Sequence, residues 1–208
     1  MTKTALKGNA EKLAELYFLD RPAEQVIEEL VANVVNDCSH KLKVKATLLQ
    51  CYHHAIHNRY YQAKQLLMRS NLINTISKQQ ISNQICFNRA VVQIGLSAFR
   101  LGMFEECNQT LQDIAQNPKL KETLAQGSSS RLQQEKTLEE EIEEKKRFVP
   151  PHLQINLEQV DCVYMTTSMM LEVVNISENK FSVQRKVISR NFRKLIEQYD
   201  IKGIQFVP

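Results

Sequence analysis

One helical pattern occurs twice in this sequence at a constant spacing of 44 residues, from Cys51 to Gly95 and again from Ala63 to Cys107. In each copy apolar residues recur three and four positions apart, stop at a short break and resume, which predicts two antiparallel helices joined by a turn. Small residues at the four repeated positions allow the two helices of each hairpin to approach closely. A chain built from such units buries its apolar faces by stacking them.

The two hairpins have defined limits and defined core positions. The first is predicted at about 42–68 with its turn at 57–59, and the second at about 87–114 with Gly102 ending its first helix. The residues that we expect in the core are Leu48, Tyr52, Ala55, Ile56, Tyr60, Ala63 and Leu67 in the first hairpin, and Phe87, Val91, Ile94, Ala98, Phe104, Cys107, Leu111 and Ile114 in the second. The spacing exceeds the 34 residues of a tetratricopeptide repeat, so these are irregular repeats with extra length at 71–80.

The segments on either side of the repeat also have helical patterns. An apolar stripe at 22–37 predicts a helix capped by Asp20, after a shorter helix that contains Leu13, Leu16 and Tyr17. Asn117 and Pro118 begin a short helix that Gly127 is expected to end. With only five glycines and five prolines in 208 residues, hairpin-rich β folds and glycine loops for phosphate are disfavoured, and the chain is predicted to be all-α.

A charged stretch and two further helices complete the chain. The segment 128–147 contains an acidic run at 139–144 followed by three basic residues, and it is either a solvated helix or connector or a charged arm that contacts a partner. Asn156 is expected to cap an apolar helix, with Gln159 completing a capping box. The positions expected to be buried in that helix are Val160, Val163, Tyr164, Met170, Leu171 and Val174. A last helix at about 183–199 carries Ile188, Phe192, Leu195 and Tyr199 on one face.

The sequence offers little support for catalysis. His53 and His57 are four residues apart on a helix and could share a metal ion, but residue 54 is His where zinc peptidases have Glu, so helix histidines without a metal are favoured. No nucleophile elbow or phosphate loop occurs. We therefore expect no enzyme activity, no cofactor and no small-molecule substrate. Five cysteines without a Cys-x-x-Cys pair, and no signal peptide or membrane span, predict a cytoplasmic protein with reduced thiols and no membrane contact.

The last helix carries the most unbalanced charge. Six basic residues and one acidic residue between 178 and 194 give a net charge of +5, against +4 for the whole chain. Possible RNA or ribosome contacts are Lys186, Arg190, Arg193 and Lys194. A solvated helix face is the commoner reason for such a pattern, and no aromatic residues interleave with these cations to read bases.

Several runs resemble one known family in order and in spacing. They are Tyr52–Ala55 with Tyr61–Lys64, Asn88–Gly102, Ala125–Gly127 with Arg131, Ile155–Glu158 with Cys162–Tyr164, Met169–Glu172 and Ile188–Phe192. Over about 41–199 the chain resembles the central helical region of the c subunit of eukaryotic translation initiation factor 3. The resemblance implies a non-catalytic scaffold segment whose partners are the other subunits of that factor and the small ribosomal subunit. An RNA-binding module that uses the basic helix is the alternative.

The resemblance also implies an architecture. In that family, helical repeats lead into a winged helix and together form a PCI module; the winged helix and the long amino-terminal arm have no counterpart here, as expected for part of a longer protein. The expected fold is all-α, a right-handed α-solenoid of irregular tetratricopeptide-like hairpins without the winged helix. Its predicted parts are a helical-repeat region at 1–127, a charged connector at 128–149, a helical pair continuing the solenoid at 150–200 and a truncated linker at 201–208.

Overall fold

The computed structural model describes residues 22–117, 119–127, 138–178 and 197, and every regular element in them is helical. The all-α prediction is therefore confirmed for these residues. The elements are α2 (Ala23–Asp37), α3 (His40–Ile56), α4 (Tyr60–Arg69), α5 (Leu72–Thr75), η1 (Ile76–Lys78), α6 (Ile81–Arg100), α7 (Phe104–Ala115), α8 (Leu120–Thr123), α9 (Leu138–Arg147), η3 (Pro151–Leu153) and α10 (Leu157–Glu178). The expected helices around 13–17 and 183–199 lie outside the described residues.

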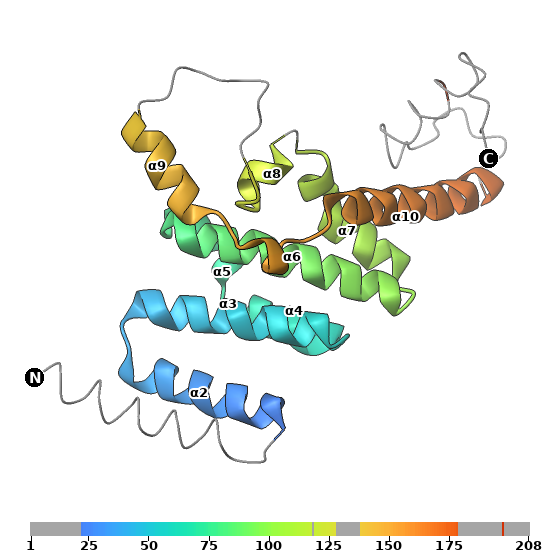
Figure 1. The fold of residues 1–208 in the computed structure, drawn as a ribbon. Coiled ribbons are helices and arrows are strands. Elements are labelled where there is room, and N and C mark those ends of the chain that lie inside the picture. The colour runs from blue at the N-terminus through green and yellow to red at the C-terminus, as the bar shows by residue number, and fades with distance from the viewer. Residues whose placement is uncertain (1–21, 118, 128–137, 179–196, 198–208) are drawn as a thin grey trace, which may run out of the picture.

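The long helices stack on one another in sequence (Figure 1). Helix α3 packs against α2, α4 and α6, while α6 packs against α3, α4 and α7. Helix α10 lies mainly on α7 and also contacts α6. The second half of α6 is consequently surrounded, and its residues 94–98 are all buried. Within the described residues no helix is long and apolar enough to span a bilayer.

The two predicted hairpins have the same turn, displaced by 44 residues. Helices α3 and α6 end at Ile56 and Arg100, and α4 and α7 begin at Tyr60 and Phe104. Asn58 and Gly102 occupy the same place in the two turns and have left-handed backbones, with φ of 59° and 77°. The backbone hydrogen bonds correspond as well: the amide of residue 59 donates to the carbonyl of 54, and that of 103 to the carbonyl of 98, each at 2.9 Å. The two turns thus have the same backbone conformation and the same hydrogen bonds, which confirms the internal repeat.

Close approach of the helices depends on the small residues, as predicted. Cys51, Ala63 and Cys107 are fully buried. A Cβ atom built on Gly95 would lie 2.6 Å from both Cγ and Cδ2 of Leu111 on the facing helix. Only a residue without a side chain fits between α6 and α7 at this point.

The core of α3 differs in part from the sequence-based prediction. Leu48 and Ala55 are fully buried, but Ile56 is 44% exposed. The buried residues of the helix are Val44, Leu48, Cys51, His54 and Ala55. Ile56 was placed in the core wrongly because it follows Ala55 by about 100° around the helix, which turns it to the outer side.

Two predicted helix ends also need correction. Helix α2 has Pro22, not Asp20, at its N-cap position. Helix α8 ends at Thr123, four residues before Gly127, and Ala125 takes the left-handed conformation there with φ of 54°. The amide of Gln126 then donates to the carbonyl of Lys121 at 2.9 Å, which satisfies the helix end without a glycine.

Candidate functional site

The basic residues predicted to contact RNA or the ribosome, Lys186, Arg190, Arg193 and Lys194, lie outside the described residues.

The histidine cluster at the end of α3 lies within the described residues. His53 and His57 face each other with ring centroids 4.4 Å apart, and His54 on the same helix is only 7% exposed. Burial and the neighbouring His57 lower the pKa of His53, and burial lowers that of His54 although Glu28 opposes the shift. No group of three potential metal ligands occurs among the residues that the structure describes.

Helix α10 has the N-cap residue that the sequence predicts. The side-chain oxygen of Asn156 accepts hydrogen bonds from the amides of Glu158 at 3.0 Å and Gln159 at 3.3 Å. Such an N-cap satisfies amides that have no partner inside the helix. These bonds fix where α10 starts.

The packed face of α10 is more polar than predicted. Val160, Val163 and Tyr164 are buried as expected, and the hydroxyl of Tyr164 accepts a hydrogen bond from Gln116 at 3.0 Å. The next buried residues are polar, however: Thr167, Ser168 and Glu172. Ser168 donates to the side-chain oxygen of Asn108 on α7 at 3.1 Å, a buried polar contact that ties the two helices together.

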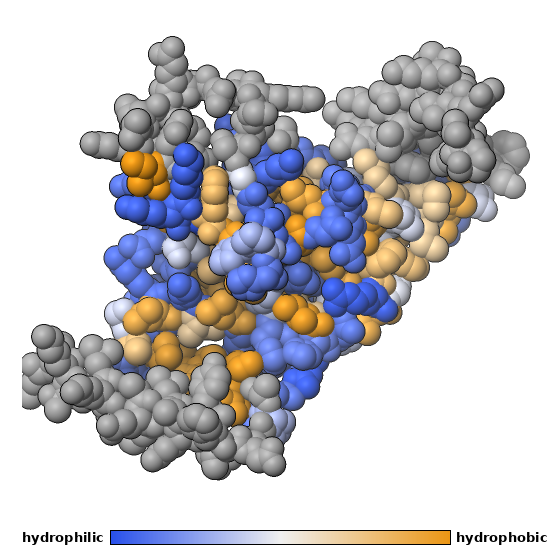
Figure 2. Space-filling model, viewed as in Figure 1, coloured by the Kyte–Doolittle hydropathy of each residue, from blue (hydrophilic) through white to orange (hydrophobic). Residues whose placement is uncertain are grey.

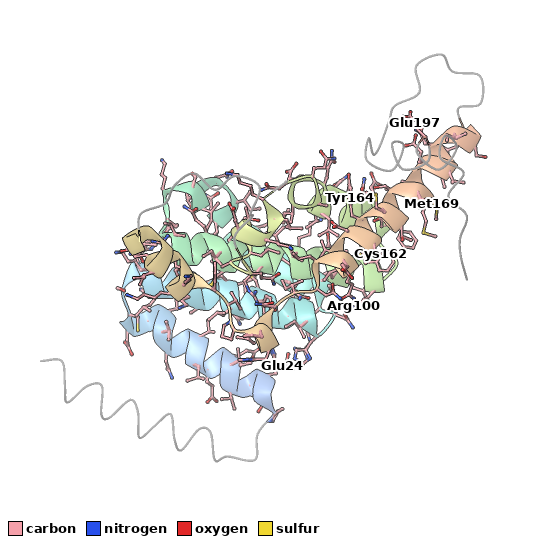
Figure 3. The ribbon with its side chains drawn as sticks, turned by 45° about the horizontal axis from the view of Figure 1, so that its top comes forward. Glu24, Arg100, Cys162, Tyr164, Met169 and Glu197 are labelled. Atoms are coloured by element: carbon pink, nitrogen blue, oxygen red, sulfur yellow. The ribbon has the colours of Figure 1, made fainter. Side chains whose placement is uncertain are left out.

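As a result, α10 carries an exposed apolar surface, which we call the α10 face. The placement of Met170 and Val174 in the core was wrong, because they are 41% and 55% exposed. The α10 face comprises Met169, Met170, Val173, Val174 and Ile176, and Figure 2 shows apolar residues gathered along this helix. Figure 3 shows Met169 on α10 beyond Tyr164. A cluster of large apolar side chains in water is typical of a surface that another protein covers.

A second feature lies between α3, α6 and the segment that joins α9 to α10. Here a pocket of about 570 Å³, which we call the Arg89 pocket, is lined by both helices and by residues 146–150 and Leu153. Figure 1 shows that segment crossing α6 on its way to α10. The amide of Val149 donates to the carbonyl of Ala125 at 2.8 Å, and Asn88 donates to the carbonyl of Thr123 at 3.2 Å. These bonds fix the wall of the pocket against α6.

Arg89 is the polar centre of the pocket, although it is only 8% exposed. Its Nη2 donates to the carbonyl of Leu153 at 2.5 Å and to the Tyr52 hydroxyl at 3.4 Å. The guanidinium also lies over the Tyr52 ring, 5.6 Å from the centroid, which favours the cation. Nearby, burial raises the pKa of the Cys86 thiol, while Lys45 and Arg89 oppose the shift.

Sequence reasoning did not assign a role to Arg89. The available signal was a cation in the midst of an apolar helical stretch, with Phe87 and Val91 on either side. Arginine is almost never fully buried unless it is paired, so an arginine in a core helix is expected to have partners from elsewhere in the fold.

Comparison with known proteins decides the family. A model of the family described as eukaryotic translation initiation factor 3 subunit 8 N-terminus matches residues 7–183. The chain belongs to this family. The match begins well before 41, where the resemblance was expected to begin, and it ends at 183, before the run Ile188–Phe192. The description of the model corresponds to the family's amino-terminal region.

The curated relatives are all much longer than the matched segment. The c subunit of eukaryotic translation initiation factor 3 from Danio rerio is 40% identical over 156 residues, which cover 75% of this chain and 17% of that protein. The same protein of Xenopus tropicalis is 39% identical with the same coverage. That of Emericella nidulans is 37% identical over 177 residues, 84% of this chain and 21% of the relative. The chain thus spans about a fifth of the length of the relatives that it matches.

Proposed function

We propose that this chain is a non-catalytic scaffold segment within the c subunit of translation initiation factor 3, where it contacts other subunits of the factor and supports its binding to the small ribosomal subunit. Membership of the family supports the assignment to the factor. The observation that carries the contact function is the α10 face, five large apolar side chains exposed at the end of the helix stack. The helix that carries them is held on α7 by the buried contacts of Tyr164 and Ser168.

The repeated hairpins support a scaffold of defined shape. Arg100 at the end of α6 donates to the Asn58 side-chain oxygen at 2.7 Å and to the carbonyl of Ile56 at 3.4 Å, joining the second hairpin to the turn of the first. Glu24 forms an ion pair with Arg59 and so joins α2 to the same turn. We propose that this arrangement is a section of a right-handed α-solenoid and that 1–127, 128–149, 150–200 and 201–208 are its parts. Cytoplasmic location and the absence of catalysis belong to the same proposal.

The test is affinity purification of the tagged protein from its native cells. The natural form should recover other subunits of the factor together with small ribosomal subunits. The double variant V173E/V174E places two charges on the α10 face at positions that are 60% and 55% exposed, so the fold should be retained while recovery falls. A control, Leu42→Glu, introduces one such charge at a residue that is 51% exposed on α3, and the single variant Val173→Glu is its charge-matched counterpart on the α10 face. Recovery of neither subunits nor ribosomes with the natural protein would overturn the assignment.

The basic segment at 178–194 favours a second candidate function, direct binding of RNA. We propose Lys186, Arg190, Arg193 and Lys194 as the contacts, because a net charge of +5 in so short a segment can neutralise several phosphates. Changing Arg190, Arg193 and Lys194 to Glu should abolish binding of a single-stranded RNA and remove its steep dependence on salt. A folded variant that binds RNA as before would exclude this segment.

A further inference from the structure

The Arg89 pocket contains a buried positive charge without an acidic residue among the described residues of its walls. Arg89 is 8% exposed, and its Nη1 atom has no hydrogen-bond partner in the part of the chain that the structure describes. The groups that its Nη2 reaches, a carbonyl and a phenol hydroxyl, are both neutral. Burying a guanidinium is costly unless an anion and a full set of hydrogen bonds compensate for it. The pocket therefore has the electrostatics of a site for an anionic group.

The rim of the pocket adds to this charge. Lys146 and Arg147, at the end of α9, line it and are exposed to solvent. Arg147 also pairs with Glu143 at 3.2 Å on the solvent side, where both side chains are largely exposed. An approaching anion would thus meet Lys146 and the paired Arg147 at the rim and a buried guanidinium inside.

The remaining walls are apolar and set the second requirement for a ligand. Leu48, Leu49 and Ile85 come from the two long helices, and Phe148, Pro150 and Leu153 from the crossing segment. A volume of about 570 Å³ lies in the usual range for sites that enclose a small ligand or a few side chains. A nucleic-acid backbone would instead need a row of exposed cations with little apolar surface. The lining favours a ligand that combines a carboxylate with apolar side chains.

We propose that the Arg89 pocket binds a short acidic peptide of a partner protein, with an Asp or Glu carboxylate on Arg89 and a neighbouring apolar side chain against Leu153. Arginine suits this function because its guanidinium stays charged when buried, and Nη1, which has no hydrogen-bond partner, can donate to a carboxylate oxygen while Nη2 keeps its contacts with Leu153 and Tyr52. The wall is already in place, since the amide of Val149 and the side chain of Gln154 hold the crossing segment. The inference deepens the proposed protein-contact function, and it concerns a surface separate from the α10 face.

The experiment is selection of a displayed library of random heptapeptides on the purified full chain. Peptides that place Asp or Glu next to Leu, Ile, Phe or Met should be enriched. A synthetic peptide from the enriched set is then titrated by fluorescence anisotropy. A twelve-nucleotide oligouridylate and inorganic phosphate are tested as competitors in parallel.

Three substitutions locate the binding site. Arg89→Gln should weaken binding of the peptide at least about tenfold, because the carboxylate loses a charged and desolvated partner. Lys146→Glu, at an exposed rim position, should weaken it several-fold, and so should Leu153→Glu, at a wall residue that is 50% exposed. The matched controls are Lys121→Glu, an exposed lysine outside the lining, and Leu42→Glu, which is 51% exposed on α3. Both controls should bind the peptide like the natural protein, and the two exposed variants keep the test valid if Arg89→Gln does not fold.

The possible outcomes are distinct. Enrichment of acidic and apolar peptides that is lost in the pocket variants and kept in the controls supports the site. The site is overturned if no such peptides are enriched, or if the Lys146 and Leu153 variants bind the peptide as tightly as the natural protein does. It is also overturned if oligouridylate competes at the same concentration as the peptide. If the natural protein binds no such peptide but recovers subunits and ribosomes normally, the peptide site alone is overturned. If it binds the peptide but recovers neither subunits nor ribosomes, the proposed function alone is overturned.

Discussion

The backbone of Gly95 on α6 lies directly against the side chain of Leu111 on α7, so that a Cβ atom at 95 would be 2.6 Å from Leu111 Cγ. Leu111 is fully buried, and its side chain has little room to move aside. Gly95→Ala therefore has two opposite effects on stability. It gains about 1 kcal/mol in helix propensity and loses about 1–3 kcal/mol through a steric clash. We expect the clash to dominate and the free energy of unfolding in urea to fall.

A double-mutant cycle separates these two effects. Leu111→Ala alone should cost about 2–5 kcal/mol because it leaves a cavity in the core. In the Gly95→Ala background the same change removes the clash as well, so its cost should be smaller by roughly 0.5–3 kcal/mol. Additive costs, or a more stable Gly95→Ala protein, would show that the two helices do not approach as described.

The repeated turn makes a prediction about Gly102. Its φ of 77° is strained for most residues, but Asn58 holds the equivalent place in the first hairpin at 59°. A Cβ at 102 would meet nothing within 4 Å, so only the backbone conformation matters. Gly102→Asn should change the stability by a few tenths of a kcal/mol, and Gly102→Val should lower it by about 1–2 kcal/mol. Urea midpoints measure the difference, and equal costs would contradict the equivalence of the two turns.

The repeat explains how much of the fold could be predicted from the sequence. Two copies of one pattern located four helices and their turns. In both copies the buried leucines, such as Leu48 and Leu111, and the small residues recur with the period of a helix. Helix α10 has no such guide. Apolar residues occur all around it, and the side that packs is chosen by Thr167 and Ser168, which fit against Cys107 and Asn108 of α7. Periodicity alone could not show that Met170 would be exposed.

The candidate sites were beyond prediction for a related reason. The Arg89 pocket depends on the crossing segment around Leu153, which lies 64 residues further along the chain. A distant segment that covers a core helix leaves no periodic signal in the sequence. The turn contacts of Arg100 and Arg59 are likewise set by tertiary packing and not by local spacing.

The histidine cluster predicts a dependence of stability on pH. The pKa values of His53 and His54 in the folded protein lie below the ordinary value of 6.5. The unfolded chain therefore binds protons that the folded protein does not, so stability is full above pH 6.5 and falls as the pH drops below it. Urea unfolding at pH 7.5 and 5.5 should show the loss, and the double variant H53Q/H54Q should reduce it. His152→Gln, at an exposed histidine outside the cluster, is the matched control for the loss of a histidine side chain.

The cysteines should differ widely in reactivity. Burial raises the pKa of the Cys51 thiol to about 12 and that of Cys107 to about 11, and both side chains are fully buried. Cys162 is exposed on α10 (Figure 3). Because only an accessible thiolate reacts with iodoacetamide, a short treatment at pH 8 should modify Cys162 and leave Cys51 and Cys107 intact. Peptide mass mapping measures this, with protein in urea as the reference in which all three react; modification of Cys51 as fast as Cys162 in the folded protein would contradict the packing of α3 against α4 and α6.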